Sequence, residues 1–347
     1  MAKTLGIGVI GLGMGKDLFY VNSDPSTQFE VRGLCAATPA KVEAAARELG
    51  IGFSTTDYAR LVDRDDLSVI AVFSPDHLHA EHCLAALQAG KHVLVTKPFV
   101  TSTADAVRIT HESEKRGLKL LVGETCRWYT SFLGVKRFYD DGELGDILFA
   151  EGHYVHEIKD YFGRTSWRLE APQDFMYGGV CHPLDSLVWF LGDVEEVHCL
   201  ANRGGLSAYP IEENFLLNVR FKNGVIARVL GAYGMVQPPW PMMGLTVYGT
   251  KATATATFED FRPSQTRIVF DKLEGNEPAV IDYPADLEGA YGQGKAVRRY
   301  LAHFEDCILN DRRPSEDARE GTKTIAALEA AWRSVRSGLP EKVVAEF

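Results

Sequence analysis

The chain has 347 residues, of which 46% are hydrophobic and 24% are charged, and its formal net charge at pH 7 is -10. This length exceeds what a single hydrophobic core usually fills and suits two domains, and the composition is that of a globular protein. The acidic balance disfavours nucleic acid and anionic membrane as partners, because both attract clustered Lys and Arg, so a small molecule is the expected partner.

The N-terminal segment and the cysteines indicate a cytoplasmic location. The start MAKTLGIGVIGLG runs directly into a predicted strand and has no signal-peptide pattern. No stretch approaches the roughly 20 apolar residues that a membrane span needs. The six cysteines are widely spaced and form no C-x-x-C pair, which is typical of reduced thiols rather than of disulfides or a zinc site.

Residues 1–125 alternate between strand patterns and helix patterns. Runs rich in Val, Ile and Leu lie at 5–13, 31–37, 68–74, 92–96 and 118–124, and amphipathic segments lie between them at 41–50, 80–90 and 104–117. Repeated β-α-β units predict a parallel, doubly wound sheet in an N-terminal α/β domain. Thr38 followed by Pro39 indicates a helix start, and Gly50 and Gly117 indicate helix ends.

Residues 126–347 show a different pattern and are expected to form a second, α+β domain. Segment 214–233 predicts a hairpin with Asn223-Gly224 in a type I′ turn, and further hairpins are predicted at 246–257 and 266–284. Consecutive hairpins build a large, mostly antiparallel open sheet. The tail returns to helical patterns, and these C-terminal helices are expected to pack back toward the cleft between the domains.

Three glycines follow the first predicted strand and precede a predicted helix. In G-L-G-M-G, the positions Gly11, Gly13 and Gly15 allow a tight turn and a close approach of the backbone to a pyrophosphate, which the helix N-terminus then stabilises. With Met14, they are candidate cofactor-binding residues of a dinucleotide-binding Rossmann domain. The spacing lacks the third glycine of the usual G-x-G-x-x-G.

The end of the second strand leaves the choice between NAD and NADP open. An NAD site usually has an acidic residue here that binds the adenosine ribose. The segment Cys35–Thr38 contains no Asp or Glu. Thr38 or Lys41 could contact a 2′-phosphate instead, although no Arg occupies the position typical of NADP enzymes.

Two longer segments resemble one known family. SPDHLHAEHCLAALQAGKHVLVTKPF at 74–99 and GGVCHPLDSLVWFLG at 178–192 are similar to motifs of the Gfo/Idh/MocA oxidoreductases, and the resemblance extends over nearly the whole chain. It implies NAD(P)-dependent hydride transfer at a hydroxyl carbon of a sugar, sugar acid or polyol. It also implies a homo-oligomer, a dimer or tetramer, because relatives commonly bury the open sheet against another subunit.

The resemblance assigns Lys97 to the lysine of the E-K-P motif, where its ammonium binds the reacting hydroxyl and stabilises alkoxide character. Thr96 stands where the family usually has Glu, so Glu124 is a candidate for the missing negative charge. In the same segment, Ser74, Pro75 and His79 are expected beside the cofactor.

His182 and Asp185 correspond to the family's H-x-x-D. His182 is the candidate general base, alone or sharing the proton with Lys97. Asp185, one helical turn further on, either orients the imidazole or caps the helix. Many relatives carry an Asp at the position of Gly178, so the usual Lys-Asp-His trio is incomplete here.

The remaining candidates for substrate binding, besides Lys97 and His182, are Arg127, Arg164 and Tyr177. The resemblance places Arg127 near the nicotinamide and substrate. Arg164 belongs to a positive group with Lys159 and Arg168 that either binds an anionic group of the substrate or lies in a solvated loop, and Tyr177 lies in the loops before His182. Trp167 and Arg168 are expected to reach the cofactor from the second domain, with an interdomain ion pair or core packing as the alternative. His77, His79 and His82 invite a metal assignment, but the resemblance places His79 beside the cofactor, and no metal is expected.

Three functions remain open at this stage. The first is a dehydrogenase or reductase acting on a sugar or polyol. The second is an NAD-dependent glycoside hydrolase that oxidises a sugar transiently, eliminates the aglycone, adds water and reduces the product. The third is a non-catalytic binding protein, which the presence of Lys97 and His182 disfavours.

Overall fold

The computed structural model of the chain describes residues 4–159, 171, 173–206, 209–236, 241–258, 264–270, 279–283 and 294–347. The chain divides into two compact units. It crosses from the first unit to the second between Glu124 and Thr125, one residue before the predicted boundary. It also returns to the first unit at helix α9 (Gly294–Leu309), which the prediction placed in the second domain, and leaves it again after Thr322.

Six parallel strands form the sheet of the first unit, in the order β3-β2-β1-β4-β5-β6. Their bounds are β1 Leu5–Ile10, β2 Phe29–Cys35, β3 Phe53–Thr55, β4 Val69–Val72, β5 His92–Thr96 and β6 Leu120–Gly123. Every residue of β1, β4 and β6 is buried, as expected of a sheet covered on both faces. The predicted α/β class is confirmed. The strand order reverses between β1 and β4, where doubly wound sheets have their crevice.

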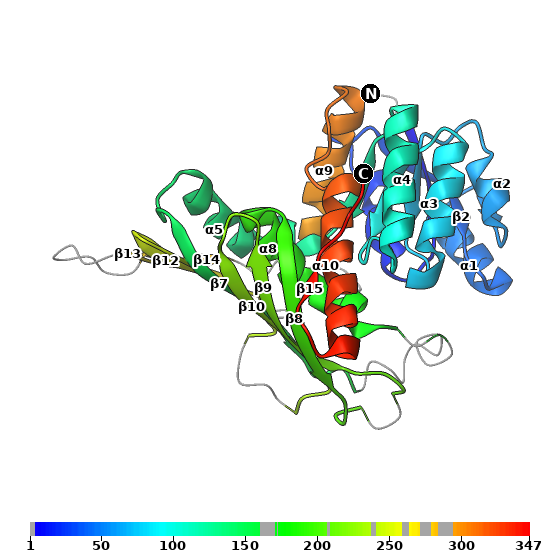
Figure 1. Cartoon of the computed structure of the whole chain (residues 1–347). Coiled ribbons are helices and arrows are strands. Elements are labelled where there is room, and N and C mark those ends of the chain that lie inside the picture. Colours follow the sequence, from blue (N-terminus) through cyan, green and yellow to red (C-terminus); the bar gives the residue numbers. More distant parts are fainter. Residues whose placement is uncertain are drawn as a thin grey trace. The chain divides into compact units, whose positions relative to one another are not determined.

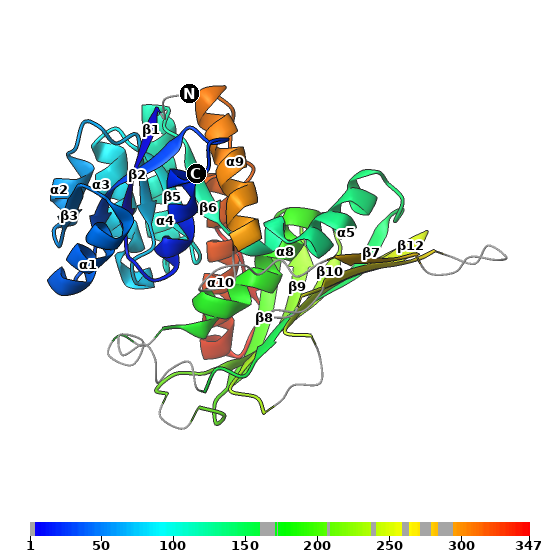
Figure 2. The same ribbon diagram turned by 180° about the vertical axis from the view of Figure 1, so that it is seen from behind.

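Helices cover both faces of this sheet (Figures 1 and 2). Helices α2, α3 and α4 follow one another on one face, and η1 and α9 pack together on the other. The bounds are α1 Pro39–Leu49, α2 Tyr58–Val62, α3 His79–Gln88 and α4 Thr103–Arg116, with 3-10 segments η1 Met14–Asn22 and η2 Asp76–Leu78. Thr38 precedes α1, and Gly50 and Gly117 end α1 and α4 with positive φ, as predicted. The helix after the glycines is a 3-10 helix.

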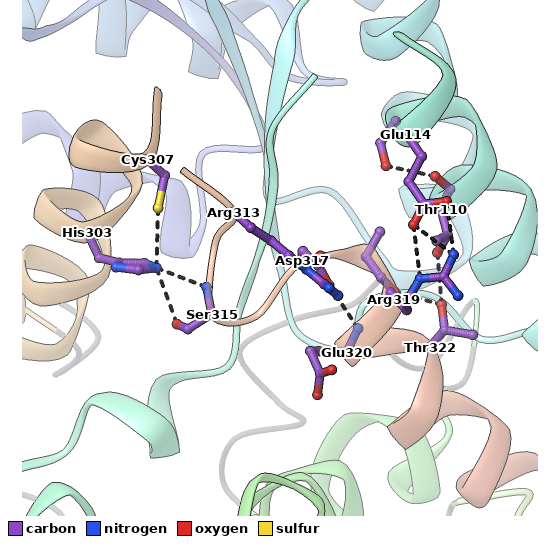
Figure 3. Close-up of polar contacts among 12 residues, drawn as sticks. Thr110, Glu114, His303, Cys307, Arg313, Ser315, Asp317, Arg319, Glu320 and Thr322 are labelled. Atoms are coloured by element: carbon purple, nitrogen blue, oxygen red, sulfur yellow. Dashed lines mark hydrogen bonds and ion pairs between the residues drawn. The ribbon is translucent and has the colours of Figure 1, made fainter. Parts of the chain in front are cut away.

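The C-terminal part of the first unit covers the sheet edge at β6. The backbone N–H of Val122 donates a 2.8 Å hydrogen bond to the carbonyl of Glu316. At the start of α10 (Ala318–Ser337), Arg319 donates two hydrogen bonds, of 2.9 and 3.0 Å, to the carboxylate of Glu114 on α4 (Figure 3). An edge strand exposes unpaired backbone groups. Covering that edge explains why this segment joins the first unit.

The second unit is built on a nine-stranded sheet in the order β14-β13-β12-β11-β7-β10-β9-β8-β15. The bounds are β7 Ile147–His156, β8 Val194–Asn202, β9 Asn214–Phe221, β10 Ile226–Tyr233, β11 Met243–Gly249, β12 Ala252–Phe258, β13 Ser264–Phe270, β14 Ala279–Tyr283 and β15 Glu341–Lys342. Strands β7 and β10 pair in parallel, and the other neighbours pair antiparallel. The predicted mostly antiparallel sheet is confirmed.

The predicted hairpins are present, but the turn type at Asn223-Gly224 was predicted wrongly. A type I′ turn needs positive φ at both central residues. Gly224 has a φ of 89°, whereas Asp311 is the single non-glycine residue with positive φ in the described part of the chain. The Asn223 side chain instead accepts the N–H of Val225 at 3.1 Å. A longer loop with glycine in the left-handed region therefore connects β9 and β10.

Helices of the second unit lie on one face of its sheet (Figures 1 and 2). Helix α5 (Thr130–Asp140) packs on β12 and β13, and α8 (Cys181–Leu191) packs on β7 and β11. Inward residues of β9 alternate with exposed ones, as one-sided burial requires. Exposed Leu200, Leu216 and Ile226 lie on the outward-facing side, which no helix of the described residues covers.

Among the described residues, no helix combines the length and the apolar character needed to cross a membrane.

Candidate functional site

The carboxyl ends of the parallel strands bring several predicted residues to one edge of the first sheet. Ile10 pairs with Cys35 and with Val72, and Val72 pairs with Val95, so these strands end at the same level. Gly11, Ser74 and Lys97 follow β1, β4 and β5 by one or two residues. The sheet therefore positions these three loops next to one another, at the edge where nucleotides bind in such folds.

The three glycines after β1 have different surroundings. Gly11 has a φ of 96°, and a Cβ there would lie 2.2 Å from the carbonyl oxygen of Phe73. A Cβ at Gly15 would lie 2.9 Å from Val9 on the strand, whereas a Cβ at Gly13 would meet no atom within 4 Å. These are the three requirements of a pyrophosphate turn: a tight bend, an accessible backbone and close packing of the following helix on the strand.

The end of β2 lacks an acidic residue of its own, but Asp57, the N-cap of α2, follows the neighbouring strand β3, and its side chain accepts the N–H of Ala59 at 2.9 Å. Cys35 pairs with Thr55, the last residue of β3, and Asp57 follows two residues later. Burial raises the pKa of the Cys35 thiol to about 11, and the charge of Asp57 adds to the effect. Thr38 and Lys41 are exposed at the start of α1. The sequence does not show that Asp57 lies near the end of β2, because strand order is not visible in it.

Lys97 and Glu124 follow adjacent strands. Thr96 pairs with Gly123, so each residue lies one position beyond a paired position of β5 and β6. Thr96 and Glu124 are buried, and Lys97 is half-buried. The register therefore places the Glu124 backbone beside that of Lys97.

Two histidines of the predicted P-x-x-x-H segment are buried in hydrogen-bonded positions. His79 is 0% exposed, and its ring nitrogens lie 2.8 Å from the carbonyl oxygens of Ser74 and Pro98. His82 Nδ1 lies 2.8 Å from the Ser74 hydroxyl oxygen. Burial is the main cause that lowers the pKa of His82 to about 4, so this ring is neutral near pH 7. Pro75 is half-buried directly after Ser74.

In the second unit, His182 lies in the first turn of α8 and is buried. Its Nδ1 lies 3.5 Å from the Cys126 sulfur, and its ring packs edge-on against Tyr154, with the centroids 5.5 Å apart. The sequence prediction did not single out Cys126, because the two residues lie 56 positions apart. A thiol beside one ring nitrogen influences which tautomer the imidazole adopts.

Asp185 takes neither of its two predicted roles. Its carboxylate accepts hydrogen bonds of 2.6 and 2.8 Å from the guanidinium of Arg127 and one of 2.8 Å from the hydroxyl of Thr324. All three side chains are buried, with exposed fractions of 3–5%. The carboxylate thus joins α8 to η3 (Thr125–Trp128) and α10, and Arg127, predicted to bind substrate, directs its guanidinium toward Asp185.

Tyr177 lies in a π-helical segment, η4 (Met176–Val180), that leads directly into α8. Short π-helical turns often occur at functional sites. Tyr177 is buried, and burial raises its pKa above the usual range of a phenol. A Cβ at Gly178, where the resemblance predicts Asp in many relatives, would lie 2.9 Å from the Gln173 side chain. Gln173 therefore fills space that an Asp side chain would need.

The other predicted residues of the second domain, Arg164, Trp167 and Arg168, lie outside the described residues.

The comparisons with known proteins agree with this fold over nearly the whole chain. Residues 5–124 match the oxidoreductase family with an NAD-binding Rossmann fold, and residues 132–255 match the GFO/IDH/MocA C-terminal domain. The chain is 31% identical over 342 residues to inositol 2-dehydrogenase 2 of Saccharopolyspora erythraea, covering 96% of this chain and 94% of that one. It is 25% identical over 337 residues to 1,5-anhydro-D-fructose reductase of Ensifer adhaerens, covering 95% and 96%.

Among solved structures, levoglucosan dehydrogenase in complex with NADH and L-sorbose has a TM-score of 0.85 at 20% identity, covering 99% of both chains. A similarity at this identity establishes the fold. The six-stranded order, the glycine turn and the family matches together define an NAD-dependent oxidoreductase. The chain belongs to the Gfo/Idh/MocA family, which confirms the resemblance in its sequence motifs.

Proposed function

We propose that this protein transfers hydride between a nicotinamide cofactor and a hydroxyl-bearing carbon of a sugar, sugar acid or polyol. The observation that carries the proposal is the glycine turn at the switch point of the first sheet, combined with full-length similarity to an inositol dehydrogenase and an anhydrofructose reductase. Accessible backbone at Gly13 and the sharp bend at Gly11 suit a pyrophosphate. The bound nicotinamide accepts or supplies the hydride.

The proton of the reacting hydroxyl is assigned to two side chains. Lys97 follows β5 at the nucleotide-binding edge of the first sheet, and a half-buried ammonium there stabilises an alkoxide. His182 takes the proton as general base, alone or shared with Lys97. When the hydroxyl loses its proton and the carbon loses hydride, a carbonyl forms, and the reverse sequence reduces it. Tyr177 and Arg164 are assigned to substrate binding, and Trp167 and Arg168 to the cofactor.

NAD is the preferred cofactor in this proposal. A carboxylate that lies by the end of β2 accepts hydrogen bonds from a ribose 2′-hydroxyl and repels a 2′-phosphate. Asp57, after the neighbouring β3, provides that charge. The exposed ammonium of Lys41 would instead attract the 2′-phosphate of NADP, so the two residues favour different cofactors. The ratio of kcat/KM for NAD and NADP decides between them, and Asp57→Asn should shift that ratio toward NADP.

Redox-neutral glycoside cleavage is the less favoured alternative. It requires a further base and a further acid for elimination and water addition, and Asp174, two residues before η4, is an acidic residue near His182 in sequence. Asp174 accepts hydrogen bonds of 2.8 Å from the N–H of Met176 and 2.7 Å from the indole N–H of Trp332. These bonds fit a role in holding the end of α10 against η4 rather than proton transfer.

A substrate screen tests the reaction class. Nicotinamide absorbance is followed with sugars, sugar acids, polyols and glycosides, while aglycone release is measured in the same wells. Stoichiometric formation of NADH or NADPH supports net oxidoreduction. Aglycone release with catalytic cofactor, no net absorbance change and entry of solvent deuterium into the product overturns it.

We also propose that the protein is a homo-oligomer. The outward face of the nine-stranded sheet carries exposed Leu200, Leu216 and Ile226, and an exposed apolar sheet face favours association. Light scattering should give a mass of at least two chains, and Leu216→Arg should lower it. A wild-type mass of a single 38.4 kDa chain at working concentration contradicts this.

The cytoplasm is the proposed location. All six cysteines are free and buried in the structure, which suits a reducing compartment.

A further inference from the structure

The buried ring of His79 lies between two backbone carbonyls that come from different loops. Its Nε2 lies 2.8 Å from the oxygen of Ser74, in the loop after β4, and its Nδ1 lies 2.8 Å from the oxygen of Pro98, in the loop after β5. The ring is 0% exposed. Both nitrogens are thus at hydrogen-bond distance from groups that can only accept.

These two acceptors favour a ring that carries a proton on each nitrogen. A neutral imidazole has one N–H and one nitrogen with a lone pair, so it can donate to one carbonyl only. The lone pair would then face the second carbonyl oxygen at 2.8 Å, a repulsive contact between two acceptors. The imidazolium form has two N–H groups and can donate to both oxygens, and such charge-assisted hydrogen bonds are stronger than neutral ones.

His82, one turn further along α3, provides the contrast. Its Nδ1 faces the Ser74 hydroxyl, which can donate or accept, so a neutral ring satisfies this contact. Burial is the main cause that lowers the pKa of His82 to about 4, so this ring is neutral near pH 7. The two histidines of this short segment thus differ in their partners, because one faces two carbonyls and the other faces a hydroxyl.

We propose that His79 is a doubly protonated positioning residue whose two N–H groups tie the loop after β4 to the loop that carries Lys97. Pro98 directly follows Lys97, so the hydrogen bond to its carbonyl fixes the backbone beside the ammonium. Ser74 directly precedes Pro75, a predicted cofactor residue. The functional part of this proposal rests on the oxidoreductase role of Lys97 proposed above.

The charge of His79 is measured on the wild-type protein. Two-bond ¹H–¹⁵N correlation spectra of the histidine rings at neutral pH distinguish a doubly protonated ring from either neutral tautomer. We expect both nitrogens of His79 to be protonated. Ring signals are assigned through Cβ correlations, so the measurement does not depend on any variant folding. A His79 ring with one unprotonated nitrogen overturns the proposal.

The positioning role is tested with His79→Gln, which keeps one amide donor, and with His79→Leu, which keeps none. We expect kcat to fall by about tenfold or more in His79→Gln and further in His79→Leu, because a small displacement of a catalytic group is costly. Hydrogen exchange should become faster in segments 74–78 and 96–100 and stay unchanged in the second unit. Wild-type kcat in both variants, or faster exchange throughout the chain, overturns the role.

His77→Gln is the matched control, since His77 is exposed and lies two residues earlier in the same segment. It should leave kcat and exchange at wild-type values. Failure of the proposed function can be recognised separately. If wild-type protein shows no nicotinamide-linked turnover in the substrate screen, kcat cannot be compared between variants. The ring spectrum and the hydrogen-exchange pattern then still decide whether His79 ties the two loops.

Discussion

The strand ends of the first unit and the α8 region of the second unit use their polar residues in different ways. At the strand ends, Gly13 leaves its backbone open and Lys97 is only half-buried, so the cofactor-binding turn and the ammonium remain accessible. Around α8, Arg127 and Asp185 are buried and paired with each other. Arginine and aspartate inside a protein satisfy one another, whereas catalytic groups need a vacant hydrogen-bond position for substrate.

This difference shows how one motif can combine chemistry and stability. In H-P-L-D, His182 begins α8 and is assigned to proton transfer, while Asp185 one turn further on joins three elements of the second unit. A motif match alone gives both residues equal weight. Both side chains are buried, but their partners differ: Asp185 forms a bidentate ion pair with Arg127, whereas the Nδ1 of His182 faces the Cys126 thiol. The following experiments test this difference.

The largest expected effect comes from breaking the buried pair. Asp185→Ala leaves the Arg127 guanidinium buried without its bidentate partner, which should cost about 3–5 kcal/mol of unfolding free energy. Urea unfolding measures the loss. Asp141→Ala is the matched control, because its ion pair with Arg137 is exposed and 3.7 Å long and should contribute less than about 1 kcal/mol.

A second variant distinguishes charge pairing from catalysis. Arg127→Met with Asp185→Leu removes both charges and should recover most of the lost stability, since apolar replacements of buried pairs are often neutral. If Asp185→Ala unfolds as easily as Asp141→Ala, or if it abolishes turnover without destabilising the protein, Asp185 acts in the chemistry and the contrast drawn above is wrong.

The next effect concerns the residues assigned to proton transfer. Lys97→Ala and His182→Ala should each lower turnover by at least about a hundredfold, equivalent to about 2.7 kcal/mol, because acid-base assistance is lost. Circular dichroism and cofactor titration should stay near wild-type values. Lys115→Ala, at an exposed position of α4, is the control and should retain full turnover. Full activity in either of the first two variants removes that residue from the mechanism.

Within the glycine turn, two substitutions should give opposite results. Gly11→Ala should lose about 2 kcal/mol of stability, because its φ is positive and its Cβ would meet the Phe73 carbonyl. Gly13→Ala should stay within about 0.5 kcal/mol, since its Cβ meets no atom. Gly13→Asp should fold but bind cofactor at least about tenfold more weakly, because its carboxylate repels the pyrophosphate. Unchanged cofactor affinity in Gly13→Asp contradicts this location for the dinucleotide.

The fold was predictable where local rules decide it. Alternating apolar strands and helices indicated the parallel sheet, and Thr38-Pro39, Gly50 and Gly117 marked helix ends because capping depends on nearby residues. The placement of α9 in the first unit was not predictable, because it depends on which strand lies at the edge of the sheet, and the strand order is set by tertiary structure. The turn at Asn223 was also missed, since its side chain bonds its own loop.

The candidate site was predictable as a set of positions, and only partly as a set of contacts. Motif spacing identified Lys97 and His182, but it did not indicate Cys126, Gln173 or Thr324, which approach the motif residues from distant parts of the chain. Strand order hid Asp57 in the same way. Contacts between residues far apart in sequence depend on tertiary packing, which no local pattern encodes.

The smallest expected effect is a pH dependence in the helix that follows the glycine turn. Asp17 lies in η1, and its Oδ2 is buried without a hydrogen-bond partner in the described part of the chain. Burial raises its pKa from 3.8 to about 6, so the folded protein binds this proton more tightly than the unfolded chain does. Its contribution to stability is complete below the unfolded pKa of 3.8 and is lost as the pH rises through about 6.

Asp17→Asn removes this dependence, because an amide stays neutral at every pH. Relative to wild type, the variant should gain about 1 kcal/mol between about pH 5 and about pH 8, a modest value since solvent reaches part of the carboxyl group. Urea unfolding at both pH values measures the change. A stability difference that stays constant with pH means that Asp17 ionises equally in the folded and unfolded chain. In that case the carboxyl group of Asp17, in the helix after the glycine turn, would be as well compensated by its surroundings as the paired residues around α8.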